Sequence, residues 1–134
     1  RAPQAAQVSQ MKIYNVDALG KPVGPYSHVA RVKSGETLYI AGMLAPGASF
    51  EAQCSAVYGQ IEQALKSAGA GWGNVAQFTT FLVHSQDIAG FYRWREREYP
   101  KMFPDGNYPP NTLLIIDRLV QEQFLVEVQV IAAL

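Results

Sequence analysis

A glutamate near the end of the chain has the side chain best placed for chemistry. In residues 124–132 the side chains alternate in the manner of a strand. One face carries three valines, and the other carries Glu127 between Leu125 and Gln129. Either this second face is the wet side of an antiparallel sheet, or its apolar neighbours desolvate Glu127 in a cleft or subunit interface. In the second case burial raises the pKa of the carboxyl group, which could then hold or activate a water as general acid/base chemistry requires.

Three further residues lie where strands begin or end. Residues 108–110, Tyr-Pro-Pro, start the apolar run 111–116 in an extended conformation, because proline cannot belong to a helix interior. Asn111 and Thr112 open this strand. Gly42 closes an earlier apolar run, and a glycine there either terminates the strand or lets another group approach the backbone closely.

The other reactive side chains are typical of structural roles. His28 and His84 are the only histidines, and nothing in the sequence pairs them as the acid and base of a nuclease. Cys54 is the only cysteine, which excludes an internal disulfide and a cysteine-based metal site, and it falls on the apolar stripe of a helix. Residues 93–98, Arg-Trp-Arg-Glu-Arg-Glu, favour a salt-bridged solvent face over a nucleic-acid surface.

The composition limits the possible partners. A chain of 134 residues fits one domain, and a charged content of only 16% is low for a monomer that covers its own surface. Eleven basic and eleven acidic residues give no net charge, so we expect no nucleic-acid partner. No run approaches the roughly 18 apolar residues of a membrane span, so we expect a cytoplasmic protein without a membrane partner. Nothing indicates a metal or other cofactor.

The order of predicted elements gives the fold class. We expect strands at 11–16, 29–32, 37–41, 74–84, 111–116 and 124–132, and helices at 50–68 and 88–103. The second and third strands are predicted to form a hairpin through residues 33–36, with Gly35 at the positive φ. Two helices on one face of a sheet make a two-layer α+β domain over residues 11–134. Residues 1–10 are expected to be a disordered leader or a remnant of cloning.

Five segments together resemble the YjgF or Rid family, whose members are reactive-intermediate deaminases, also known as L-PSP endoribonucleases or translation inhibitors. They are residues 24–27 (Gly-Pro-Tyr-Ser), 38–42 (Leu-Tyr-Ile-Ala-Gly), 78–83 (Phe-Thr-Thr-Phe-Leu-Val), the helix end at 99–103, and 126–132 (Val-Glu-Val-Gln-Val-Ile-Ala). The resemblance covers essentially residues 11–134.

The resemblance implies a chorismate-mutase-like fold, a homotrimer, and clefts between subunits that bind a small metabolite. In deaminating members a strand arginine binds the substrate carboxylate, a glutamate holds the attacking water, and a tyrosine and backbone amides complete the pocket. Tyr26 matches that tyrosine, Gly42 the strand-end glycine and Glu127 the water-holding glutamate. Asn111, followed by Thr112, stands where the family has its arginine.

This departure leaves two functions open. Asparagine offers a neutral amide in place of a charged bidentate fork, so carboxylate binding at Asn111 should be weaker. The chain is then either a divergent hydrolytic deaminase of an enamine or imine, or a non-catalytic trimer that binds a small metabolite. An endoribonuclease or translation inhibitor, as known for some relatives, is a further alternative. An alternative cation in the cleft, such as Arg118 or an arginine of the second helix from a neighbouring subunit, would favour the enzyme.

Overall fold

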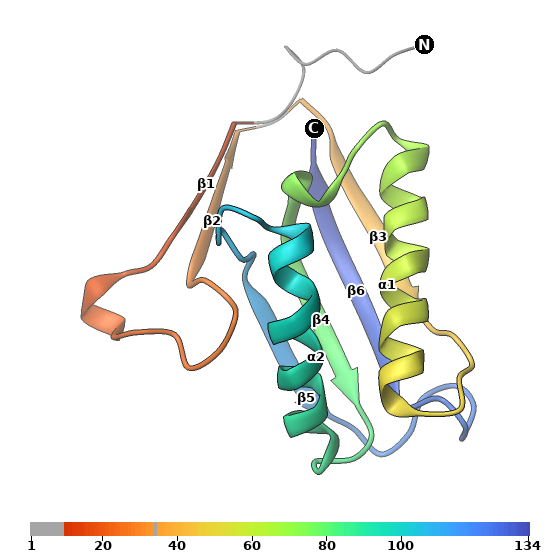
Figure 1. The fold of residues 1–134 in the computed structure, drawn as a ribbon. Coiled ribbons are helices and arrows are strands. Elements are labelled where there is room, and N and C mark those ends of the chain that lie inside the picture. Colours follow the sequence, from red (N-terminus) through yellow and green to blue (C-terminus); the bar gives the residue numbers. More distant parts are fainter. Residues whose placement is uncertain (1–9, 34) are drawn as a thin grey trace.

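A four-stranded mixed sheet with two helices on one face forms the body of the molecule (Figure 1). The structure, a computed structural model, describes residues 10–33 and 35–134. Its strands are β1 (Gln10–Tyr14), β2 (Val29–Lys33), β3 (Thr37–Met43), β4 (Val75–Leu82), β5 (Asn111–Ile115) and β6 (Val126–Ala133). Its helices are α1 (Phe50–Ser67) and α2 (Asp87–Met102), with short 3-10 turns η2 (Asp17–Leu19) and η3 (Trp72–Asn74). The predicted two-layer α+β architecture is confirmed.

The order of strands in the main sheet is β3-β6-β4-β5. β6 runs antiparallel to both of its neighbours, whereas β5 runs parallel to β4. A parallel pair needs a crossover, and α2 supplies it between β4 and β5. β6 is therefore an inner strand, and its glutamate, Glu127, lies in the interior of the sheet between β3 and β4.

The predicted hairpin between the second and third strands is wrong. β2 pairs with β1 in a separate two-stranded sheet, and β3 pairs with β6 instead. The two residues just before β3 are held beside Leu134, because the backbone N–H groups of Gly35 and Glu36 donate to the carbonyl of Leu134 at 3.0 and 3.3 Å. The expected leader, residues 1–10, lies outside the described residues except for Gln10, which begins β1.

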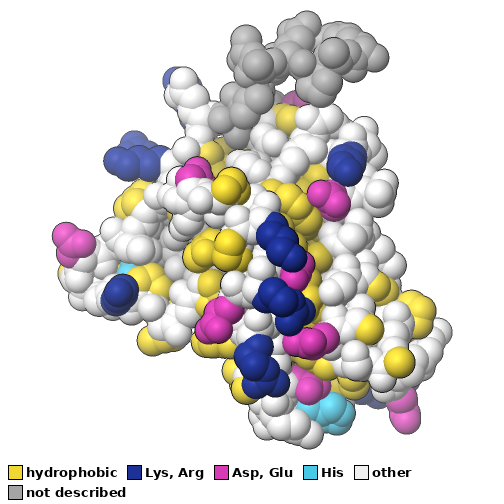
Figure 2. All heavy atoms as spheres, viewed as in Figure 1, with side chains coloured by type: hydrophobic (Ala, Val, Ile, Leu, Met, Phe, Trp, Pro, Cys, Tyr) yellow, Lys and Arg dark blue, Asp and Glu magenta, His cyan; other side chains and the backbone are white. Residues whose placement is uncertain are grey.

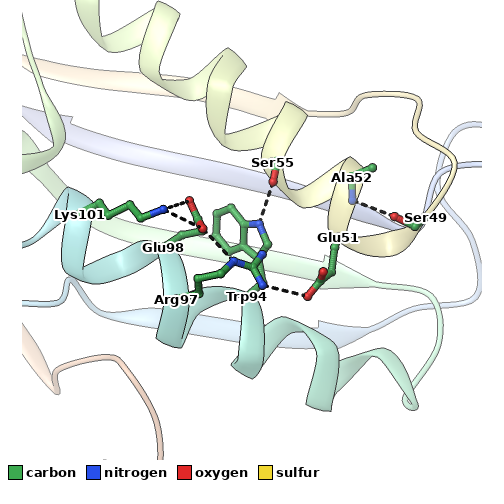
Figure 3. Close-up of polar contacts among 8 residues, drawn as sticks. All are labelled: Ser49, Glu51, Ala52, Ser55, Trp94, Arg97, Glu98 and Lys101. Atoms are coloured by element: carbon green, nitrogen blue, oxygen red, sulfur yellow. Dashed lines mark hydrogen bonds and ion pairs between the residues drawn. The ribbon is translucent and has the colours of Figure 1, made fainter.

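The helices begin and end close to the predicted residues. The Ser49 hydroxyl accepts a hydrogen bond from the Ala52 N–H at 3.1 Å and so caps α1 (Figure 3). Gly69, at φ 72°, follows its end and adopts a conformation that other residues rarely take. The core lies between these helices and the sheet and includes Cys54, which is fully buried as predicted.

The expected solvent face at residues 93–98 is only partly correct. Arg97 is exposed and pairs with Glu51 and Glu98 (Figure 3). Trp94 and Arg95, however, are each only 1% exposed. The Trp94 indole N–H donates to Ser55 on α1 at 2.9 Å, which ties the two helices together (Figure 3). Two residues of the charged run therefore belong to the core.

The helix-covered side shows positive and negative side chains intermixed, with apolar atoms between them (Figure 2). This face therefore carries no extended basic surface of the kind that binds phosphates. Within the described residues, no helix is long and apolar enough to cross a membrane.

Candidate functional site

Glu127 lies on the sheet face that the helices do not cover. Its neighbours Val126 and Val128 are fully buried against the helices, so the alternation of β6 turns Glu127 outward. Across the sheet it faces Phe81 of β4. Glu127 is half-buried, whereas Gln129, the next outward residue on β6, is exposed. The carboxylate is therefore partly enclosed by its own chain.

Gly42 is the residue that allows this placement. A Cβ added at Gly42 would overlap Oε2 of Glu127 and lie 2.6 Å from its carboxyl carbon. β3 and β6 are locally irregular between Ile40 and Met43, where the carboxylate crosses the backbone. Of the two interpretations open at the sequence level, close approach applies, because β3 continues to Met43 and the glycine does not end it.

Asn111 and Thr112 lie on opposite faces of the sheet. Asn111 pairs with Phe78, which faces the helices, and its Oδ1 accepts a hydrogen bond from the buried Thr80 hydroxyl at 2.7 Å. Thr112 pairs with Thr79 and shares the open face with Glu127, although β4 separates their strands. Within one chain, Asn111 and Glu127 therefore cannot contact the same small ligand.

Tyr26 lies in the loop that precedes β2. Its ring packs edge-on against His28, with 6.4 Å between centroids. His28 itself has a structural role, because its Nδ1 accepts from the Val16 N–H and its own N–H donates to Asn15, both at 3.0 Å. Tyr26 follows directly after the segment Pro22–Pro25, which forms one wall of a cleft.

This cleft has a volume of about 410 Å³ and lies between the N-terminal loop and α2. Its lining residues are Pro22, Val23, Gly24, Pro25, Tyr92, Arg95, Glu96 and Tyr108. The loop approaches α2 tightly, since a Cβ at Gly24 would lie 3.0 Å from the Tyr92 hydroxyl. Tyr108 comes three residues before Asn111, so the cleft and Asn111 both lie on the helix-facing side of the fold.

Arg95 is the positively charged residue that lines this cleft, and the sequence indicated it only as one of several arginines of the second helix. Its guanidinium carbon lies 4.2 Å from the ring centroid of Phe91, 4.8 Å from that of Tyr92 and 5.8 Å from that of Tyr99. Nε and Nη1 of Arg95 are buried without a hydrogen-bond partner. Phe91, Arg95 and Tyr99 recur every four residues, and this spacing could have placed Arg95 on the inner face of the helix.

The environment of Arg95 does not fully compensate its burial. Stacking on aromatic rings contributes about 0.5–2 kcal/mol, whereas each buried unpaired donor costs about 1–3 kcal/mol, and more when charged. Beside it, burial raises the pKa of the Tyr99 hydroxyl to about 12, although the Arg95 charge and the hydrogen bonds to Tyr58, at 2.7 Å, and to Arg95 oppose that shift. Arg118, the other alternative cation, donates hydrogen bonds to the carbonyls of Leu119 and Val120 and to the carboxylate of Glu122.

No group of three or more His, Cys, Asp or Glu side chains that could hold a metal ion occurs in residues 10–33 and 35–134. The candidate chemistry in this part of the chain therefore rests on Glu127 and on the Arg95 cleft.

Comparison with known proteins places this geometry in a family. The family model described as Endoribonuclease L-PSP matches residues 16–134. A RutC family protein of Synechocystis sp. is 28% identical over 133 residues, which span 92% of this chain and 97% of the relative. A protein of the conserved Rid family from Yersinia pestis has a similar structure, with a TM-score of 0.80 at 24% identity, covering 92% of this chain and 98% of that one. RidA from the Antarctic bacterium Psychrobacter sp. gives a TM-score of 0.64 at 24% identity, covering 92% of this chain and 99% of that one. The chain belongs to the YjgF/Rid family, which includes the proteins described as L-PSP endoribonucleases.

Proposed function

We propose that this protein hydrolyses a small, reactive enamine or imine, and that its active sites lie in clefts between the subunits of a homotrimer. The observation that carries the proposal is the carboxylate of Glu127, which lies over the backbone of Gly42 on an uncovered sheet face. Because Gly42 has no side chain, the carboxylate can lie close to the backbone in a fixed position, which suits a general base.

In the proposed reaction Glu127 holds a water and takes its proton as the oxygen attacks the carbon of the C=N bond. Glu127 passes this proton to the nitrogen, and the hydroxyl proton of the tetrahedral intermediate then follows to the same nitrogen as the C–N bond breaks. One C=N bond and one water give one C=O bond and one ammonia, so no oxidant, metal or other cofactor is needed. The Gly42 backbone, Asn111 and Thr112 orient the substrate, and Tyr26 closes the pocket.

A homotrimer is needed because a single chain does not bring all of these residues within reach of Glu127. Glu127 and Thr112 lie on the open sheet face, whereas Asn111 lies on the helix side. The open face also carries exposed apolar side chains, with Tyr39 80% and Leu114 39% exposed. A neighbouring subunit that packs on this face would bury them and bring its own Tyr26 and Asn111 toward Glu127.

The test is to generate imines in situ with an amino-acid oxidase or a serine/threonine dehydratase and to follow ketoacid release with and without the protein. Wild type should accelerate release, and Glu127→Gln should reduce the acceleration by about 100-fold or more, since an amide cannot take the proton. Glu122→Gln is the matched control, because that glutamate is exposed in a loop. A Glu127→Gln protein with wild-type turnover would refute the mechanism. If wild type accelerates the hydrolysis of no imine, the metabolite-binding alternative is favoured.

A further inference from the structure

Arg95 is a permanent positive charge that is buried on the wall of a cleft and has no anionic partner among the described residues. Of its nitrogens, Nε and Nη1 lack any hydrogen-bond partner. Arg97, two residues along the same helix, is instead exposed and pairs with two glutamates. Pairing with a glutamate is therefore possible on α2, and Arg95 is turned away from it.

Arg95 shares a side-chain hydrogen bond with Tyr99, but its Nε and Nη1 remain without a partner. Phe91, Tyr92 and Tyr99 pack against the guanidinium, and rings over a planar cation satisfy its faces but not the N–H groups at its edge. These edge donors are the groups that bind carboxylates and phosphates. An anion that enters within the plane of the guanidinium would pair with Nε and Nη1, which the walls of the cleft cover in its absence.

The cleft restricts which anion fits. Its other walls are the Pro22–Pro25 loop and the rings of Tyr92 and Tyr108, which are mainly apolar. Glu96 also lines the cleft, and its carboxylate disfavours ligands with more than one negative charge. A volume of about 410 Å³ is in the range of small-molecule pockets.

We propose that Arg95 is the anion-binding residue of this protein and that the cleft between residues 22–25 and α2 takes a small monocarboxylate. This inference rests on the proposed function in one respect: the carboxylate is taken to belong to the imine or enamine substrate, or to the oxoacid formed from it. Arg95, on the second helix, would then provide the positive charge that the neutral side chain of Asn111 cannot offer to the carboxylate.

Binding is tested by titrating the full-length protein with pyruvate, with its neutral amide pyruvamide, and with inorganic phosphate, using NMR shifts and the thermal unfolding midpoint. Pyruvate should bind and raise the midpoint, while pyruvamide and phosphate should bind at least tenfold more weakly. Arg95→Met should weaken pyruvate binding by tenfold or more, and Arg93→Gln, an exposed arginine on the same helix, should leave it unchanged. Equal binding of pyruvate and pyruvamide, tighter binding of phosphate, or undiminished binding by Arg95→Met would overturn the proposal.

A purely structural role for Arg95 makes the opposite prediction for stability. If the arginine holds the core together, Arg95→Met should lower the unfolding midpoint in the absence of ligand. If it is kept for an anion, the methionine variant should be at least as stable as wild type without ligand and should gain nothing from pyruvate. Should the methionine variant not fold, Arg95→Lys decides: it keeps the charge with a different donor geometry, and undiminished pyruvate binding would refute the assignment.

Failure of this inference is distinguishable from failure of the proposed function. Pyruvate binding needs no turnover, so its dependence on Arg95 is measured separately from the catalytic role of Glu127. Arg95-dependent pyruvate binding without turnover of any imine would support the binding site and refute the deaminase. Turnover that is unaffected by Arg95→Met would support the deaminase and refute the binding site.

Discussion

Gly42→Ala tests the position of the catalytic carboxylate without touching its chemistry. The new methyl group would overlap Oε2 of Glu127 and lie 2.6 Å from its carboxyl carbon. To reach an ordinary contact of 3.4 Å, that carbon must move by about 0.8 Å. Because a misplacement of about 1 Å can cost on the order of 100-fold in rate, we expect Gly42→Ala to reduce imine hydrolysis by about 30- to 100-fold.

The stability of this variant should change little. Gly42 is not among the glycines with positive φ, so alanine is compatible with its backbone. The atoms that must move belong to the flexible end of a side chain, and alanine in a strand gains about 0.5–1 kcal/mol over glycine. The free energy of unfolding should therefore stay within about 1 kcal/mol of wild type, so that a loss of rate cannot be attributed to unfolding.

The assay is ketoacid release from imines generated in situ, with urea unfolding and light scattering on the same samples. Gly59→Ala is the control, because a Cβ there meets no atom within 4 Å. That change lies within α1 and should stabilise the protein by about 0.5–1 kcal/mol without changing the rate. A Gly42→Ala protein that folds and assembles like wild type and keeps its full rate would refute the role assigned to the Glu127–Gly42 contact.

Three further predictions concern assembly, pH and the missing arginine. Light scattering of wild type should give three times the chain mass of 14.7 kDa, and Tyr39→Lys on the exposed face of β3 should lower that mass; a wild-type monomer at micromolar concentration would contradict the trimer. Burial raises the pKa of the Cys54 thiol from 9.0 to about 12 and that of the Tyr99 hydroxyl from 10.0 to about 12. The contribution of these two neutral groups to stability is therefore complete below pH 9 and is lost as the pH rises to 12. A urea midpoint that stays constant from pH 9 to 12 would contradict this prediction. Asn111→Arg should raise turnover of carboxylate-bearing imines about tenfold by adding a charge-assisted hydrogen bond, chiefly in the Arg95→Met background if Arg95 already binds the carboxylate; a folded double variant that gains nothing would contradict this.

Local pattern predicted the elements of this fold better than it predicted their pairing. The alternation in residues 124–132 and the helical stripe of α1 depend on neighbouring residues, and both are present in the structure. The pairing of β3 depends on β6, about ninety residues further along the chain, and no local signal reports it. The hairpin prediction failed for this reason: a short loop favours pairing with the adjacent strand, but β6 offers β3 a place in the main sheet.

The candidate site was predictable where a single strand encodes it. The outward placement of Glu127 follows from alternation alone, and its partner Gly42 was identified as a residue of interest, although only the structure shows what lies against it. Arg95 was missed because the alternating charges of residues 93–98 suggested a solvent face. The stronger signal was the four-residue spacing from Phe91 to Tyr99, which places the arginine among aromatic rings.

The two halves of the proposed site lie on opposite sides of one sheet, and this arrangement gives the last prediction. Glu127 faces away from the helices, whereas Arg95 lies on the inner face of α2, so a small ligand can touch both only if they come from different subunits. Glu127→Gln and Arg95→Met trimers, each inactive alone, should therefore regain activity when they are unfolded together and reassembled as an equal mixture. In random trimers about a quarter of the inter-subunit sites would combine an intact Glu127 with an intact Arg95, so activity should approach about a quarter of wild type. Glu127→Gln mixed with the Glu127→Gln/Arg95→Met double variant is the matched control and should stay inactive. Mixed trimers, verified by mass, that show no recovered activity would mean that the two residues do not serve one shared site.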